Sequence, residues 1–141
     1  MQAANYDTGG QALAYNVSSV NGSANSYRPD GVDLESCSDT GCGYDIGWTG
    51  TGQWFRYTVN AATAKTYTVT LRLSSPSGVT DALHIANSAG ANLSGSVNAP
   101  NTGGWQTYAT ATVSVALPAG KQTLTIYQDN GGWNIHDLTF S

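Results

Sequence analysis

Most of the chain alternates apolar and polar residues, which is the pattern of antiparallel strands with one buried face. Segment 66–73 is the clearest case, because Tyr67, Val69, Leu71 and Leu73 share one face while polar residues occupy the other. Similar alternation predicts further strands over 12–17, 31–35, 53–59, 81–87, 105–116, 121–127 and 133–140. No segment shows the apolar spacing of a helix.

Clusters of Gly, Asn, Pro and Ser separate these segments, for example at 21–23 and 75–78. Eight or more short strands at a spacing of about ten residues predict an all-β fold, a β-sandwich. The length of 141 residues leaves room for one domain. Within 133–140 the apolar parity shifts between Ile135 and Leu138, which predicts a β-bulge.

The composition narrows the classes of partner. Five Lys and Arg against nine Asp and Glu give a net charge of −4, which argues against nucleic acid as a partner. No apolar run reaches the roughly 20 residues of a membrane span. The start at Met1 has neither a basic nor an apolar segment behind it, so we expect no signal peptide. We interpret the chain as a module taken from a longer secreted protein.

Two cysteines, Cys37 and Cys42, stand five positions apart in a polar stretch. A zinc site would need four ligands, and the two histidines, His84 and His136, lie far away in the sequence. We therefore predict a local disulfide, with two free thiols as the alternative.

No catalytic motif is present: the sequence has no nucleophile elbow, zinc-protease motif or phosphate loop. A glycosidase needs two carboxylates about 5–10 Å apart. Glu35 is the only glutamate, and most aspartates stand in turn contexts. A small glycoside hydrolase remains an alternative.

Aromatic residues follow Gly-rich turns at 101–105 and 129–133, which are near copies, and at 43–48. Sugar rings have flat apolar faces edged with hydroxyls, and aromatic faces with a few amide or carboxylate groups bind them. A tryptophan at the start of a strand can equally pack in the core, so spacing alone does not separate Trp105 from Trp133.

Seven stretches of the sequence stand in a recognisable order: 4–7, 27–35, 43–49, 52–59, 101–107, 117–120 and 132–135. On these stretches the chain resembles a family 6 carbohydrate-binding module over nearly its whole length. The resemblance implies a β-sandwich with jelly-roll topology, non-catalytic and appended to secreted polysaccharide-degrading enzymes.

The resemblance also implies roles for residues. Tyr44 and Trp105 would form opposite walls of a cleft at the loop end of the sandwich, with Asn134 on its floor. Asp30 and Asn130 are secondary candidates for binding. The other tryptophans are then interpreted as structural: Trp133 as a neighbour of the site, and Trp48 and Trp54 as packing residues.

Members of the family usually hold a structural calcium with two glutamates near the N-terminus and an acid near the C-terminal strand. Here Gln2 and Ala4 stand at the first two positions and His136 at the third, with Asp137 beside it. Gln2 and Asp137 are the remaining candidate ligands, so we expect any calcium to be held weakly.

We therefore expect an extracellular, non-enzymatic module, monomeric and tethered to a catalytic domain. It would bind a β-linked polysaccharide or its chain end, a β-glucan such as laminarin, or xylan. Agarose, a marine galactan, is an alternative ligand, and a structural or adhesive sandwich that binds no glycan is an alternative function.

Overall fold

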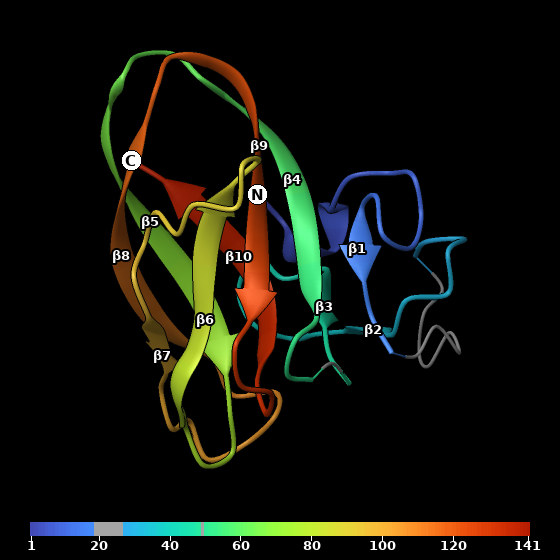
Figure 1. Ribbon diagram of the computed structural model, residues 1–141. Helices are drawn as coiled ribbons and strands as arrows, with labels where there is room; N and C mark the ends of the chain where they lie inside the picture. The colour runs from blue at the N-terminus through green and yellow to red at the C-terminus, as the bar shows by residue number, and fades with distance from the viewer. Residues whose placement is uncertain (19–26, 49) are drawn as a thin grey trace.

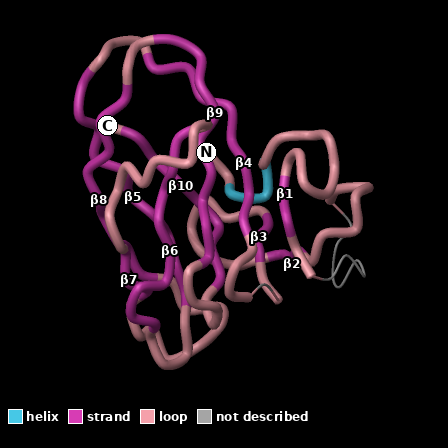
Figure 2. The backbone as a smooth tube through the Cα atoms, in the orientation of Figure 1, coloured by secondary structure: helices cyan, strands magenta, loops and turns pink. Residues whose placement is uncertain are grey.

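The computed structural model describes residues 1–18, 27–48 and 50–141. Its strands form two five-stranded antiparallel sheets packed face to face (Figures 1 and 2). The first sheet contains β1 (Tyr15–Asn16), β4 (Trp54–Ala61), β9 (Gly120–Gln128), β6 (Val79–Asn87) and β7 (Val97–Ala99) in that order. The second contains β2 (Leu34–Ser36), β3 (Tyr44–Ile46), β10 (Asn134–Phe140), β5 (Lys65–Ser74) and β8 (Ala109–Leu117). The predicted all-β sandwich is confirmed.

The core lies between the sheets and follows the predicted alternation. On β5, Val69, Leu71 and Leu73 are completely buried, whereas Thr66 and Thr68 are exposed on the outer face. A short 3₁₀ turn, η1 (Ala3–Asn5), precedes the strands. None of the described residues belongs to a helix long and apolar enough to cross a membrane.

The alternation of apolar and polar residues does not predict β3 and β7, because each of these strands has only three residues. The strand predicted over 105–116 begins at Ala109, since residues 100–108 form a loop between β7 and β8. The predicted bulge is confirmed: Ile135 pairs with Leu73 and Asp137 with Arg72, so His136 has no partner in the ladder.

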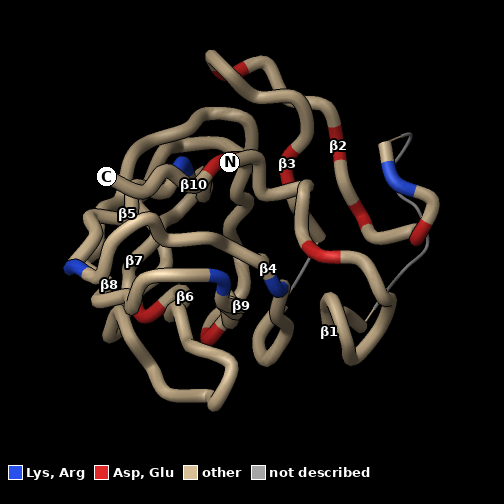
Figure 3. The backbone as a smooth tube through the Cα atoms, turned by 90° about the horizontal axis from the view of Figure 1, so that it is seen from above, with Lys and Arg blue, Asp and Glu red and all other residues tan. Residues whose placement is uncertain are grey.

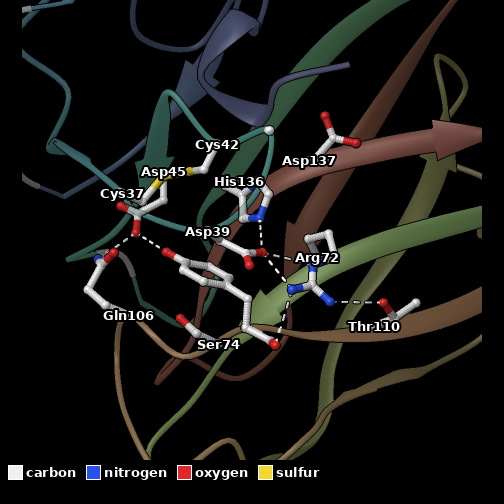
Figure 4. A network of polar contacts seen from close by, with 12 residues as sticks. Cys37, Asp39, Cys42, Asp45, Arg72, Ser74, Gln106, Thr110, His136 and Asp137 are labelled. Carbon is white, nitrogen blue, oxygen red and sulfur yellow. Dashed lines mark hydrogen bonds and ion pairs between the residues drawn. A yellow bond between two sulfur atoms is a disulfide. The ribbon is translucent and has the colours of Figure 1, made fainter.

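The predicted disulfide between Cys37 and Cys42 is present in the loop that joins β2 to β3. Asp39, inside this loop, accepts hydrogen bonds from Arg72 on β5 and contacts His136 Nε2 on β10 at 2.8 Å (Figure 4). The disulfide therefore closes the loop on itself, and Asp39 fastens the loop to β5 and β10 of the second sheet.

We predict that Cys37→Ser/Cys42→Ser lowers the free energy of unfolding by about 2 kcal/mol, because the unfolded chain regains the entropy of a short open loop. Urea denaturation monitored by tryptophan fluorescence measures this. As a control, a reducing agent should shift the midpoint of the parent and leave that of the double variant unchanged. If the double variant and the oxidised parent had the same midpoint, the disulfide would not contribute to stability.

Candidate functional site

The candidate site is a hollow of about 640 Å³ beyond the ends of β3 and β9. Three tryptophans line it, Trp48, Trp105 and Trp133, and each of them follows a glycine in the sequence. The residues that line the hollow are Glu35, Gly47, Trp48, Trp105, Gln106, Gly132, Trp133 and Asn134. We call this hollow the cleft.

Two of the tryptophans have exposed side chains at the cleft. Trp48 is 54% exposed and Trp105 is 50% exposed, which is unusual for the largest apolar residue. Trp48 has a φ of 50°, a left-handed backbone conformation that residues other than glycine rarely adopt. Such strain is concentrated at functional sites, and here it accompanies an indole that stays in contact with solvent.

The loop that carries Trp105 is fixed to the strand ends by its backbone. The carbonyl of Trp105 accepts hydrogen bonds from Ser74 Oγ and from Asn134 Nδ2, the latter at 3.3 Å. Thr102 Oγ1 also donates to the Ser75 carbonyl at 3.0 Å. Although residues 100–108 form no strand, the position of the indole is thus set by β5 and β10.

The floor of the cleft is formed by the start of β10. Asn134 is 4% exposed, and its side-chain oxygen packs against Gly47: a Cβ at residue 47 would lie only 3.2 Å from Asn134 Oδ1. Trp133 is 2% exposed, and its Nε1 donates to the Asn130 carbonyl at 2.7 Å. A buried amide and a buried indole therefore line the cleft together with two exposed indoles.

One carboxylate and one amide from separate segments border the same cleft. Glu35 on β2 and Gln106 in the β7–β8 loop both line it, and Gln106 Nε2 donates to Glu35 Oε1 at 2.7 Å. Seen from above, acidic residues lie along β2 and β3, while the few Lys and Arg are spread over the molecule (Figure 3). The cleft thus offers a carboxylate and amides between apolar walls.

The structure brings together two of the three main site residues predicted from the sequence. Trp105 and Asn134 line one cleft, as the resemblance implied. Tyr44 is placed elsewhere, at the opposite end of β3 from Gly47, where its half-buried ring stacks on Tyr27 with centroids 4.9 Å apart. Trp48, and not Tyr44, is the second exposed aromatic residue that lines the cleft with Trp105.

The interpretation of Trp48 as a packing residue is therefore wrong. Trp133 is buried, as predicted. Trp54 does pack, but on the outer face of the first sheet, half-buried beside Tyr127 at 6.4 Å between centroids and beneath the guanidinium of Arg56. His84, which stacks on Tyr127 with centroids 4.9 Å apart, extends this outer aromatic row.

The secondary candidates, Asp30 and Asn130, do not line the cleft. Asp30 accepts hydrogen bonds from the Tyr6 hydroxyl and from Arg28 Nε, both at 2.9 Å. Asn130 Nδ2 donates to the backbone carbonyls of Thr80 and Asp81. The contacts of both side chains tie neighbouring segments together.

Sequence reasoning missed Trp48, Glu35 and Gln106. The signal for Trp48 was present, because Gly47-Trp48 repeats the dipeptide of Gly104-Trp105 and Gly132-Trp133. The resemblance to the family assigned the cleft wall to Tyr44, four residues earlier, and Trp48 was therefore interpreted as a packing residue. Glu35 and Gln106 are 71 positions apart, and only the folded sheet brings them together.

Comparison with known proteins now decides the family. The model of "Carbohydrate binding module (family 6)" matches residues 23–141, which is most of the chain. The chain belongs to this family. The family binds carbohydrate, and the resemblance of the sequence is confirmed over the matched range.

Relatives of this family 6 module include parts of enzymes. The C-terminal family 6 module of a marine laminarinase from Zobellia galactanivorans is 26% identical with a TM-score of 0.78, covering 100% of this chain and 96% of that one. A module of Cellvibrio mixtus lichenase 5A, solved in complex with cellotriose, is 32% identical with a TM-score of 0.70, covering 77% and 85%. The clotting factor G alpha subunit of Tachypleus tridentatus is 30% identical over 74% of this chain, which spans only 16% of that protein.

The contacts around the predicted calcium ligands do not fit a calcium site. The Gln2 amide donates to the Gly41 carbonyl at 2.5 Å, and its oxygen accepts from the Gly43 amide at 3.2 Å. Asp137 is 3.2 Å from the amino group of Met1 and accepts from the Thr139 hydroxyl. Among the described residues, no group of three or more His, Cys, Asp or Glu could hold a metal ion.

We predict that calcium has little effect on this module, because Gln2 already bonds the disulfide loop and Ala4 offers no side-chain oxygen. Melting temperatures in excess calcium and in excess chelator should agree within about 2 °C, or roughly 0.5 kcal/mol for a chain of this size. Differential scanning calorimetry measures this. A large increase with calcium would show that backbone oxygens suffice for binding.

A second prediction concerns Asp39. Its hydrogen bonds to Arg72 hold the pKa of its carboxyl below the ordinary value of 3.8. A carboxyl group whose pKa is lower in the folded than in the unfolded chain stabilises the fold at pH values above its unfolded-state pKa. This stability is lost as the pH falls through the folded-state pKa. Asp39→Asn should therefore reduce the free energy of unfolding at pH 7. We expect only about 1 kcal/mol, because both side chains of the Asp39–Arg72 pair are partly exposed and water screens their interaction.

The difference between the parent and Asp39→Asn should shrink as the pH falls below about 4. Urea denaturation of both proteins between pH 7 and pH 2.5 provides the comparison. If the two curves remained parallel over this range, the ionised form of Asp39 would not be what holds the loop.

Proposed function

We propose that this module binds a β-linked glucan such as laminarin in the cleft, with a sugar ring held between Trp48 and Trp105, and that it does not cleave the glucan. One observation carries the proposal: two exposed indoles border a single hollow whose floor is the buried amide of Asn134. The indoles match the flat C–H faces of a sugar ring, and the amide matches its hydroxyls.

The choice of a β-glucan is supported by the named relatives. One is a module of a laminarinase, and another was solved with cellotriose, an oligosaccharide. The cleft supplies one carboxylate, Glu35, and amides from Gln106 and Asn134, which are groups that hydrogen-bond sugar hydroxyls. Xylan and agarose are the comparison ligands, because the same aromatic walls would accept their rings.

The acids at the cleft do not suit catalysis of glycoside hydrolysis. That reaction needs two carboxylates on either side of the scissile bond. Glu35 lines the cleft, but its neighbour Asp45 is completely buried beneath Gln106 and Tyr108. We therefore propose a binding module without hydrolase activity, and labelled laminarin oligosaccharides should remain intact after prolonged incubation.

We further propose that the module is secreted and appended as a monomer to a polysaccharide-degrading enzyme. The disulfide supports an oxidising compartment. The relatives from Zobellia and Cellvibrio are modules of such enzymes. By holding the enzyme near its polysaccharide substrate, a weak module raises the local concentration of the catalytic domain.

We predict a dissociation constant for laminarin oligosaccharides between millimolar and about ten micromolar, since a shallow site desolvates only one or two rings. Trp48→Ala and Trp105→Ala should each cost at least about 1–2 kcal/mol, because each removes an apolar wall. Asn134→Ala should also weaken binding by leaving a desolvated hydroxyl unpaired. Isothermal titration calorimetry with laminaritriose, cellotriose and xylotriose measures these effects.

Trp54→Ala is the matched control, because it deletes an indole outside the cleft and should leave the affinity unchanged. Tyr44→Ala should reduce stability more than affinity, since Tyr44 packs on Tyr27. If Trp48→Ala and Trp105→Ala bound as tightly as the parent while Trp54→Ala lost binding, the ligand would lie on the outer face of the first sheet.

A further inference from the structure

Two carboxylates lie side by side at the edge of the cleft. Glu35 on β2 and Asp45 on β3 are direct partners in the antiparallel ladder, so their side chains project from the same face. Like charges directly opposite each other in a sheet are destabilising, and Asp45 is completely buried. The pair therefore needs donors that hold the two groups in place.

One amide group provides them. Gln106 Nε2 donates to Glu35 Oε1 at 2.7 Å and to Asp45 Oδ2 at 2.8 Å. The hydroxyl of Tyr108 donates to the same Asp45 oxygen, and Figure 4 shows Asp45 beside Gln106. Burial raises the pKa of Asp45, while the hydrogen bonds from Tyr108 and Gln106 oppose this shift. Asp45 is thus the fixed end of a chain of bonds whose other end is Glu35.

The chain of bonds connects three segments of the cleft. Gln106 directly follows Trp105, and Asp45 stands three residues before Trp48 on the strand that leads to it. Glu35 itself lines the cleft. The side chain of Gln106 is exposed, so it buries little apolar surface and its role in the core is small.

We propose that Gln106 is a positioning residue for ligand recognition: it holds the carboxylate of Glu35 toward the bound sugar, with Asp45 as its anchor. This rests on the proposed function of the cleft. With Oε1 occupied by Gln106, Oε2 of Glu35 accepts a hydrogen bond from a sugar hydroxyl. A charge-assisted bond of this kind depends on direction, so a carboxylate free to rotate contributes less.

A double-mutant cycle with laminaritriose tests the proposal. Gln106→Met keeps the length of the side chain and removes its amide, and we expect binding to weaken about five- to tenfold. Glu35→Gln should weaken binding to a similar extent. Because Gln106 acts through Glu35, adding Gln106→Met to Glu35→Gln should cost less than about twofold more.

Gln122→Met is the matched control. It removes a glutamine amide that donates to the Pro118 carbonyl near the start of β9, whereas the cleft lies beyond the end of that strand. It should leave the affinity unchanged. Gln106→Asn, whose shorter amide cannot reach both carboxylates, should reproduce the loss if Gln106→Met folds poorly, and circular dichroism establishes which variants are folded.

Two results would overturn the proposal. In the first, Gln106→Met weakens binding equally in the parent and in Glu35→Gln, which would mean that Gln106 acts only on the Trp105 loop. In the second, the parent binds laminaritriose and Glu35→Gln binds it equally well. Absence of binding by the parent to any glycan tested would instead overturn the proposed function itself.

Discussion

The cleft depends on one buried amide, that of Asn134 at the start of β10. Its nitrogen donates to the Trp105 carbonyl, and its oxygen packs against Gly47, the residue before Trp48. Loops without a core of their own keep a defined shape only where hydrogen bonds fasten them to a strand. Two loops distant in the sequence therefore contact a single side chain, and each of them carries one exposed indole that lines the cleft.

A second constraint lies on the outer face of the second sheet, where the buried Asp45 and the partly exposed Asp39 belong to one set of polar contacts. Asp39 contacts Arg72 and His136, and the His136 ring stands edge-on to Tyr108 with centroids 4.7 Å apart. Tyr108 in turn donates to Asp45 (Figure 4). Polar groups buried together must satisfy one another, so these contacts make the disulfide loop and the rim of the cleft parts of one network.

Alternation of apolar and polar residues was sufficient to predict the long strands, the sandwich and even the bulge beside Asn134. It could not predict β3, because three residues hold too little periodicity to be recognised. The same short strand decides which aromatic residue reaches the cleft: Tyr44 begins it, whereas Trp48 lies beyond its end. Pairs such as Glu35 with Gln106 arise from sheet pairing and loop anchoring, which local sequence does not encode.

The most direct test of this account is an NMR titration with laminaritriose that follows the four indole N–H resonances, one for each tryptophan. Trp48 and Trp105 border the cleft, so their resonances should shift strongly and together as the ligand is added. Trp54, on the outer face of the first sheet, should stay unchanged, and the buried Trp133 should move little. Strong shifts at Trp54 with none at Trp48 and Trp105 would contradict the account.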